Sequence, residues 1–351
     1  MLAEVVRLFH SFVFRYGGYF FMENEQINVQ SGSKTAKSWT NLVSIVLSVL
    51  AIASLFLPLL KYEISDDVDG FLFMWDLFGA NPFQYVFVVG FILIAIALPL
   101  VVFGKEISAC ESGAILALLL GAAFLFLTPN VYNESTHGET ELFTGLALSF
   151  SFAIAAAVFA IGHSFQKMPI TIRSMAEDAI LIATAFALNF LKIPVGPTGG
   201  SINLQMLPLF IIALRHGPFH GLVCGGIIYG LLTCFTDGWG FACYPFDYLI
   251  GFGSVAVLGF FKPLIVGKDQ EFYNVKGLIF IAVGGILATC VRLLGSSISS
   301  VVLWETDFVE ALIYNAGYIP ASGAAAFLIL MAIYGPLLRV NRRFPVEEQG
   351  N

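Results

Sequence analysis

The stretch Phe83–Phe103 reads FQYVFVVGFILIAIALPLVVF and contains no charged residue. Because an α-helix rises about 1.5 Å per residue, about 20 apolar residues are enough to cross a hydrocarbon core about 30 Å thick. Asn41–Leu60 is a second stretch of the same kind. We therefore predict that the chain crosses a membrane as α-helices.

The composition of the whole chain predicts the same class of protein. The 351 residues are 58% hydrophobic and 12% charged, and the mean hydropathy is +0.85. A soluble domain with this balance would expose too much apolar surface to water. The five cysteines form no CxxC pair, which predicts neither a disulfide framework nor a metal site. We expect no metal, no cofactor and no nucleic-acid partner.

Hydropathy along the chain predicts an all-α, polytopic membrane protein with about ten transmembrane helices, four in the first half and six in the second. The expected spans are 41–60, 83–103, 112–127, 142–161, 176–191, 204–214, 219–235, 246–261, 278–302 and 311–338. Between the two sets, His163–Ser174 has the composition of a linker. We expect an N-terminal domain over residues 1–165, without a readable motif, and a six-helix domain over residues 166–351.

The charges of the predicted loops alternate along the chain. Lys and Arg collect on one side, from Lys34 to Arg343, whereas acidic groups such as Glu63–Asp69 and Glu134–Glu141 fall on the other. Basic loops favour the cytoplasm, so both termini are predicted to be cytoplasmic. The first 33 residues lack the pattern of a cleavable signal peptide and favour an amphipathic helix on the membrane surface.

Polar groups at membrane depth are costly, which makes each of them a candidate for a ligand site. In the second half these are Asp247, Arg292, Glu310 and Asn315. Snorkelling or interfacial placement is the simpler interpretation for Asp247 and Glu310. Arg292 falls about three helical turns from Trp304, too deep for that explanation.

Aromatic side chains gather at the same predicted level as these polar groups. They are Trp239, Phe241, Tyr244, Tyr248, Trp304, Tyr314 and Tyr318. An aromatic belt at the membrane interface explains such a cluster without any ligand. A site for a flat, cationic ring explains it together with the carboxylates, because aromatic faces stack on heterocycles and attract cations.

A face of small residues recurs on the span 176–191 at Ala179, Ala183 and Ala187. Spacing by four places them on one side of a helix, where another helix can approach closely. Packing inside the chain and docking of a partner subunit both account for it. The chain also lacks a GxxxxGK[ST] phosphate loop, HExxH and GxSxG, so any energy for transport must come from elsewhere.

Residues 170–343 resemble the thiamine-specific substrate-binding (S) components of energy-coupling factor (ECF) transporters. The resemblance lies in Gly199–Gly217 (GGSINLQMLPLFIIALRHG), in GLVCGGIIYGLL from Gly221, in Asp247-Tyr248, and in LIYNAGY ending at Tyr318. It implies a six-helix subunit in a bacterial plasma membrane that captures a vitamin from outside. A transmembrane coupling subunit and two ATPases would then drive uptake.

The resemblance also implies roles for particular residues. Ala179, Ala183 and Ala187 would contact the coupling subunit. The expected ligand contacts are Asp247, Tyr248, Arg292, Ser296, Trp304, Glu310 and Asn315, with Trp239 and Tyr244 nearby. Ser296 stands where the family commonly has a ligand-contacting His, and Glu310 where it has a Tyr. These departures change the hydrogen-bond pattern that the site offers.

The leading functional hypothesis is therefore capture of thiamine or a related pyrimidine or thiazole compound. An S component for another water-soluble vitamin is the alternative within transport. A membrane-embedded enzyme or assembly factor is the alternative of a different class, and the sequence contains no catalytic constellation that favours it.

Overall fold

The computed structural model describes residues 34–65, 68–78, 85–103, 108–136, 140–167, 171–195, 200–266 and 274–344, with side chains at most of these positions. The predicted surface helix within residues 1–33 lies outside this range. All described residues belong to one compact unit.

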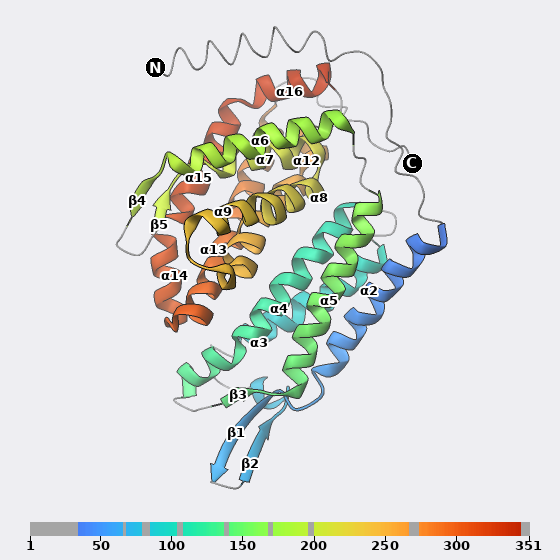
Figure 1. The fold of residues 1–351 in the computed structure, drawn as a ribbon, viewed down its shortest axis with the longest axis vertical. Coiled ribbons are helices and arrows are strands. Elements are labelled where there is room, and N and C mark those ends of the chain that lie inside the picture. Colours follow the sequence, from blue (N-terminus) through green and yellow to red (C-terminus); the bar gives the residue numbers. More distant parts are fainter. Residues whose placement is uncertain are drawn as a thin grey trace. The chain divides into compact units, whose positions relative to one another are not determined.

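The described part of the first half is a bundle of four helices, which run alongside one another in Figure 1. They are α2 (Lys34–Ser54), α3 (Tyr85–Phe103), α4 (Ser108–Thr136) and α5 (Thr144–Lys167). Two buried hydroxyls join α2 to α5: Ser44 Oγ donates to the Ala156 carbonyl at 2.9 Å, and Ser149 Oγ donates to the Ala51 carbonyl at 2.7 Å. Hydrogen bonds of this kind add to packing between helices in lipid, where no hydrophobic effect drives association.

A small antiparallel sheet closes one end of this bundle, and hydropathy did not predict it. Its strands are β1 (Leu60–Ser65), β2 (Val68–Leu72) and β3 (Thr140–Leu142), in the order β2-β1-β3. Leu60 pairs with both Leu72 and Leu142, and the Lys61 ammonium lies 3.0 Å from the Asp69 carboxylate. The short 3-10 helix η1 (Asp76–Phe78) follows β2.

The second half begins with α6 (Ile172–Phe190), which a capping box starts: the Thr171 hydroxyl accepts from the Ser174 amide, and the Ser174 hydroxyl accepts from the Thr171 amide. A two-stranded ribbon of β4 (Ile193–Val195) and β5 (Gly200–Ile202) leads to α7 (Met206–His216). Because α5 continues to Lys167, the expected linker His163–Ser174 is mostly helical, and α5 runs past the expected boundary at residue 165.

Two of the following helices contain π-helical turns. The first combines α8 (Pro218–Gly221), the π-helix η3 (Leu222–Tyr229) and α9 (Gly230–Asp237). The second combines the 3-10 turn η4 (Phe241–Cys243), the π-helix η5 (Tyr244–Ile250), α10 (Gly251–Gly253) and α11 (Ala256–Phe260). The short α12 (Lys262–Val266) comes next.

Four helices complete the chain. They are α13 (Val275–Trp304), α14 (Phe308–Ala316), α15 (Ile319–Ala332) and α16 (Tyr334–Arg343). The expected last span, 311–338, is therefore interrupted: α14 gives way to α15 at Gly317–Tyr318, and the last span ends at Ala332, because the chain turns at Ile333 before α16.

The predicted membrane class is confirmed, whereas the count of ten crossings stays a prediction. Among the described residues, seven helical stretches are long and apolar enough to cross a membrane: 86–103, 109–133, 144–165, 218–237, 241–260, 275–304 and 308–332. The apolar part of α2 (Trp39–Ser54) and α7 are shorter.

The π-helix η3 approaches η5 and α10 through glycine. A Cβ atom added at Gly225 would lie 2.5 Å from the Phe252 carbonyl oxygen of α10, and one at Gly226 would lie 2.6 Å from the Leu249 carbonyl oxygen of η5. No side chain fits at these distances without moving the backbone. Glycine therefore sets how closely η3 packs on η5 and α10.

We expect Gly226→Ala to lower the melting temperature of the purified protein, because the added methyl group must push η3 away from η5. Overpacking of this kind costs about 1–3 kcal/mol. Gly335→Ala is the matched control, since a Cβ there meets nothing within 4 Å. Thermal unfolding followed by circular dichroism in detergent measures both variants. Equal melting temperatures for the two variants would contradict the packing role of Gly226.

Candidate functional site

The most unusual polar group of the second half is the guanidinium of Arg292, in the middle of α13. Its side chain is 93% buried, and its Cζ stands 4.6 Å from the centroid of the Phe252 ring. Among the residues that the structure describes, Nε and Nη1 have no hydrogen-bond partner. A charge enclosed in this way is costly unless compensated, so the two unsatisfied donors are available to an acceptor on a bound molecule.

Ionisable side chains from three other segments interact electrostatically with this guanidinium. Asp247 comes from η5, Tyr229 from the end of η3, and Tyr318 from the turn before α15. The Tyr229 hydroxyl donates to Gln205 Oε1 at 2.5 Å. Four separate segments thus converge on one polar layer inside an apolar bundle.

Asp247 interacts with Arg292 and with two hydroxyl side chains of α13. These are Ser296 and Ser299, both of which are buried. Its position in a π-helix is informative, because π-helical turns are rare and occur frequently at functional sites. Asp247, Arg292 and Ser296, three of the predicted contacts, are therefore brought together.

Asn315 belongs to a second, fully hydrogen-bonded group. Its Nδ2 donates to the Ala311 carbonyl at 2.9 Å and to Ser300 Oγ at 3.2 Å, while its Oδ1 accepts from the Tyr318 hydroxyl at 2.7 Å. Tyr318 connects this group to Arg292. Asn315 is consequently held in one orientation before any ligand arrives.

Aromatic side chains lie at the ends of the helices that carry these groups. The indoles of Trp239 and Trp304 meet edge to face with centroids 5.8 Å apart, and both are about half exposed. Tyr244 stacks on Phe241 at 5.3 Å, and the Tyr248 hydroxyl donates to Asp237 Oδ2 at 3.3 Å. Exposed indole faces in the same half of the chain as a buried polar layer are suited to stacking on a flat ring.

Glu310 is placed differently from the other predicted contacts. It lies in the first turn of α14 and is exposed. Conversely, Gln205, Tyr229 and Tyr318 join the polar layer although sequence analysis did not select them as ligand contacts. A single Gln within the apolar run SINLQMLPLF was the available signal for the first of these.

The predicted face of small residues on α6 is exposed along its length. Ala179, Ala183 and Ala187 are all exposed, whereas Asp178, Ile182, Ala185 and Asn189 on the opposite side are buried. The helix thus packs on the rest of the second half with one side and leaves the alanine side open.

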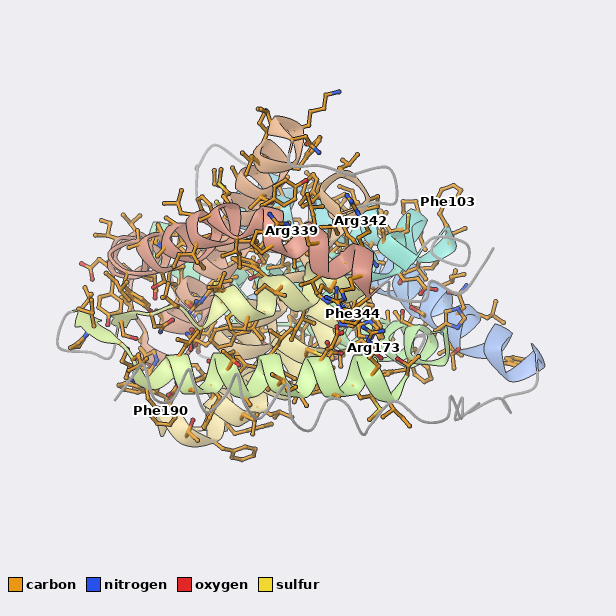
Figure 2. All side chains as sticks on the ribbon, turned by 90° about the horizontal axis from the view of Figure 1, so that it is seen from above. Phe103, Arg173, Phe190, Arg339, Arg342 and Phe344 are labelled. Carbon is orange, nitrogen blue, oxygen red and sulfur yellow. The ribbon has the colours of Figure 1, made fainter. Side chains whose placement is uncertain are left out.

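The start of α6 is fixed by a half-buried ion pair. Arg215, at the end of α7, donates from Nε and Nη2 to Glu177 at 2.6–2.9 Å and from Nη1 to Asn341 Oδ1 of α16 at 2.9 Å. The Arg173 guanidinium stands 4.6 Å from the ring centroid of Phe344. Figure 2 shows these two side chains together where α6 and α16 meet, with Phe190 at the far end of α6. Sequence analysis did not identify this cluster.

The fold and the polar layer define a helical membrane protein with a candidate small-molecule site in its C-terminal half. Comparison with known proteins is more specific. Residues 175–343 match the model of the thiamine transporter protein family. That family is one of transporters rather than enzymes.

Two curated relatives carry the same name, thiamine transporter ThiT. The protein of Bacillus subtilis is 26% identical over 178 residues, which cover 46% of this chain and 89% of the relative. That of Lacticaseibacillus paracasei is 25% identical over 191 residues, which cover 50% of this chain and 90% of the relative. A solved structure of ThiT from Listeria monocytogenes is 20% identical and has a TM-score of 0.41, covering 46% of this chain and 93% of its own.

These matches confirm the predicted resemblance for the second half of the chain. Together with the apolar helices, they identify a bacterial, multi-pass membrane protein. The family match covers residues 175–343 and thus lies within the second half.

Proposed function

We propose that this protein captures thiamine, or a related pyrimidine or thiazole compound, from outside the cell as the substrate-binding subunit of an ECF transporter. The observation that carries the proposal is the layer formed by Asp247, Arg292 and Ser296, within the segment that matches the thiamine transporter family and that also carries the paired indoles of Trp239 and Trp304. We propose that the chain consists of two domains, an N-terminal domain over residues 1–165 and a six-helix domain over residues 166–351.

The chemistry of thiamine fits these groups. Its thiazolium ring is flat and cationic, so it gains from stacking on an indole and from a nearby carboxylate. In this proposal Trp304 stacks on the ligand and Asp247 compensates its positive charge. Asn315 contacts the pyrimidine, and Arg292 donates to an acceptor of the ligand. Tyr248, Tyr244 and Trp239 close the aromatic side of the site, and Glu310 lies at its exposed edge.

Purified protein should bind the ligand without ATP, because binding of the vitamin and its transport are separate steps. The probes are thiamine, its phosphates and its pyrimidine precursor, added singly. We expect quenching of tryptophan fluorescence and a rise in melting temperature for at least one of them. If none has either effect, the thiamine class is wrong. Binding of a different water-soluble vitamin in the same assay would assign the site to that vitamin.

Asp247→Ala and Trp304→Ala should each weaken binding by at least tenfold, about 1.4 kcal/mol, since each removes one of the two groups that recognise a cationic ring. Isothermal titration calorimetry measures the affinity. Trp75→Ala is the matched control, because Trp75 is also exposed but belongs to the N-terminal half, where it stacks on Phe73. Unchanged affinity in both site variants would mean that the ligand binds elsewhere.

The alanine side of α6 is our proposed contact with the transmembrane coupling subunit, whose two ATPases would supply the energy. An exposed face of small residues lets a second helix approach closely, and lipid alone does not require it. The same proposal places both termini in the cytoplasm.

Ala183→Trp should therefore abolish vitamin uptake in cells that supply the coupling module while leaving ligand affinity unchanged. The bulky indole keeps the partner helix away from the alanine side, but Ala183 is remote from the polar layer in sequence and faces outward. Ile279→Trp on α13 is the control, because that position is exposed too. Normal uptake by the Ala183 variant would refute this contact, whether or not thiamine is the ligand.

A further inference from the structure

One helix of the N-terminal bundle is far more enclosed than the others. Within the apolar, membrane-crossing stretch of each helix, 78% of α4 is buried, compared with 33% of α3 and 39% of α5. The difference arises because α4 packs on both halves of the chain. Its neighbours in the second half are α8, η5, α11 and α13.

The contact runs along most of the length of α4. Near its start, Ile115 and Leu116 pack in a buried cluster with Phe219 and Leu222. Further along, a second apolar cluster contains Leu120, Ala123, Phe124, Leu127 and Val131 of α4, together with Phe246, Ile250, Ile298, Val301 and Ala311 of the second half. We call this second cluster the brace.

The partners of α4 in the brace lie next to the candidate ligand contacts in every segment concerned. In η5, Phe246 precedes Asp247, and its ring stacks on Phe126 of α4 at 6.3 Å. In α13, Ile298 lies between Ser296 and Ser299, the polar neighbours of Asp247. In α14, Ala311 offers its carbonyl to Asn315 Nδ2.

The segment η5 has particular need of such support. π-helical turns, which join residues five apart, are rare compared with α-helical ones. On one side η5 is held by α13, where a Cβ added at Gly295 would lie 2.7 Å from the Phe246 carbonyl oxygen. On another side Phe246 and Ile250 rest on α4. Removing α4 would leave these side chains without their apolar neighbours.

We infer that the N-terminal domain positions the ligand site: α4, through the brace, holds η5, α13 and α14 in the arrangement that brings Asp247, Arg292 and Asn315 together. Leu127 and Phe126 are positioning residues that act without touching the ligand. The inference rests on the proposed function for its ligand, but the contact between α4 and η5 is independent of what is bound.

Two leucines of α4 provide a matched test. Leu127 and Leu125 are both fully buried and lie two residues apart. Leu127 belongs to the brace, whereas Leu125 faces the N-terminal bundle, where its Cδ2 would lie 3.1 Å from a Cβ at Gly90 of α3. Truncation of either removes the same atoms from a buried position.

We expect Leu127→Ala and Leu125→Ala to lower the melting temperature alike, but only Leu127→Ala to weaken thiamine binding, by at least fivefold. Without ligand, only Leu127→Ala should speed hydrogen–deuterium exchange of the amides in residues 241–253. Leu127→Met, which restores most of the volume, should rescue both properties.

The outcomes separate the inference from the proposed function. If the wild-type protein binds thiamine and Leu127→Ala changes neither affinity nor exchange relative to Leu125→Ala, the inference is wrong. If the wild-type protein binds no member of the ligand panel, the proposed function fails, and the exchange experiment still decides whether α4 supports η5.

Discussion

The close approach of η3 to η5 and α10 at Gly225 and Gly226 is the constraint on which the rest of the second half depends. Helices in lipid associate through packing and hydrogen bonds, so the separation of two backbones decides which side chains can meet between them. With glycine at these positions, Tyr229 at the end of η3 and Asp247 in η5 both come within electrostatic reach of Arg292. A wider spacing would disperse the polar layer and leave a buried cation without its compensating groups.

The same three segments, η5, α13 and α14, contribute side chains to both the polar layer and the brace. Facing inward, η5, α13 and α14 carry carboxylate, guanidinium, hydroxyl and amide groups. Facing α4, they carry Phe246, Ile298, Val301 and Ala311. In this arrangement, tightly packed apolar side chains lie close in sequence to the polar side chains on the same segments. The bundle can therefore enclose polar groups that are costly to bury.

The sequence predicted the helical membrane class well because hydrocarbon imposes a strong, local pattern, visible in Phe83–Phe103 alone. It also selected Asp247, Arg292 and Asn315, since polar groups in apolar spans are conspicuous. The small sheet, the π-helical turns and the Glu177–Arg215 pair were not predictable in this way. Strand pairing such as Leu60 with Leu142 and the meeting of α6 with α16 depend on contacts between distant positions, and π-helical turns differ from α-helical ones only in hydrogen-bond register. Tyr229 and Gln205 were missed because their partnership joins two helices.

The ion pair at the start of α6 connects several helices of the second half. Arg215 joins Glu177 of α6 to Asn341 of α16, and Asn341 Nδ2 in turn donates to the Val266 carbonyl of α12 at 3.1 Å. These short links connect four helices, α6, α7, α12 and α16, through one buried arginine. The helix that carries the open alanine side is thus bonded, at its start, to the last helix of the described chain.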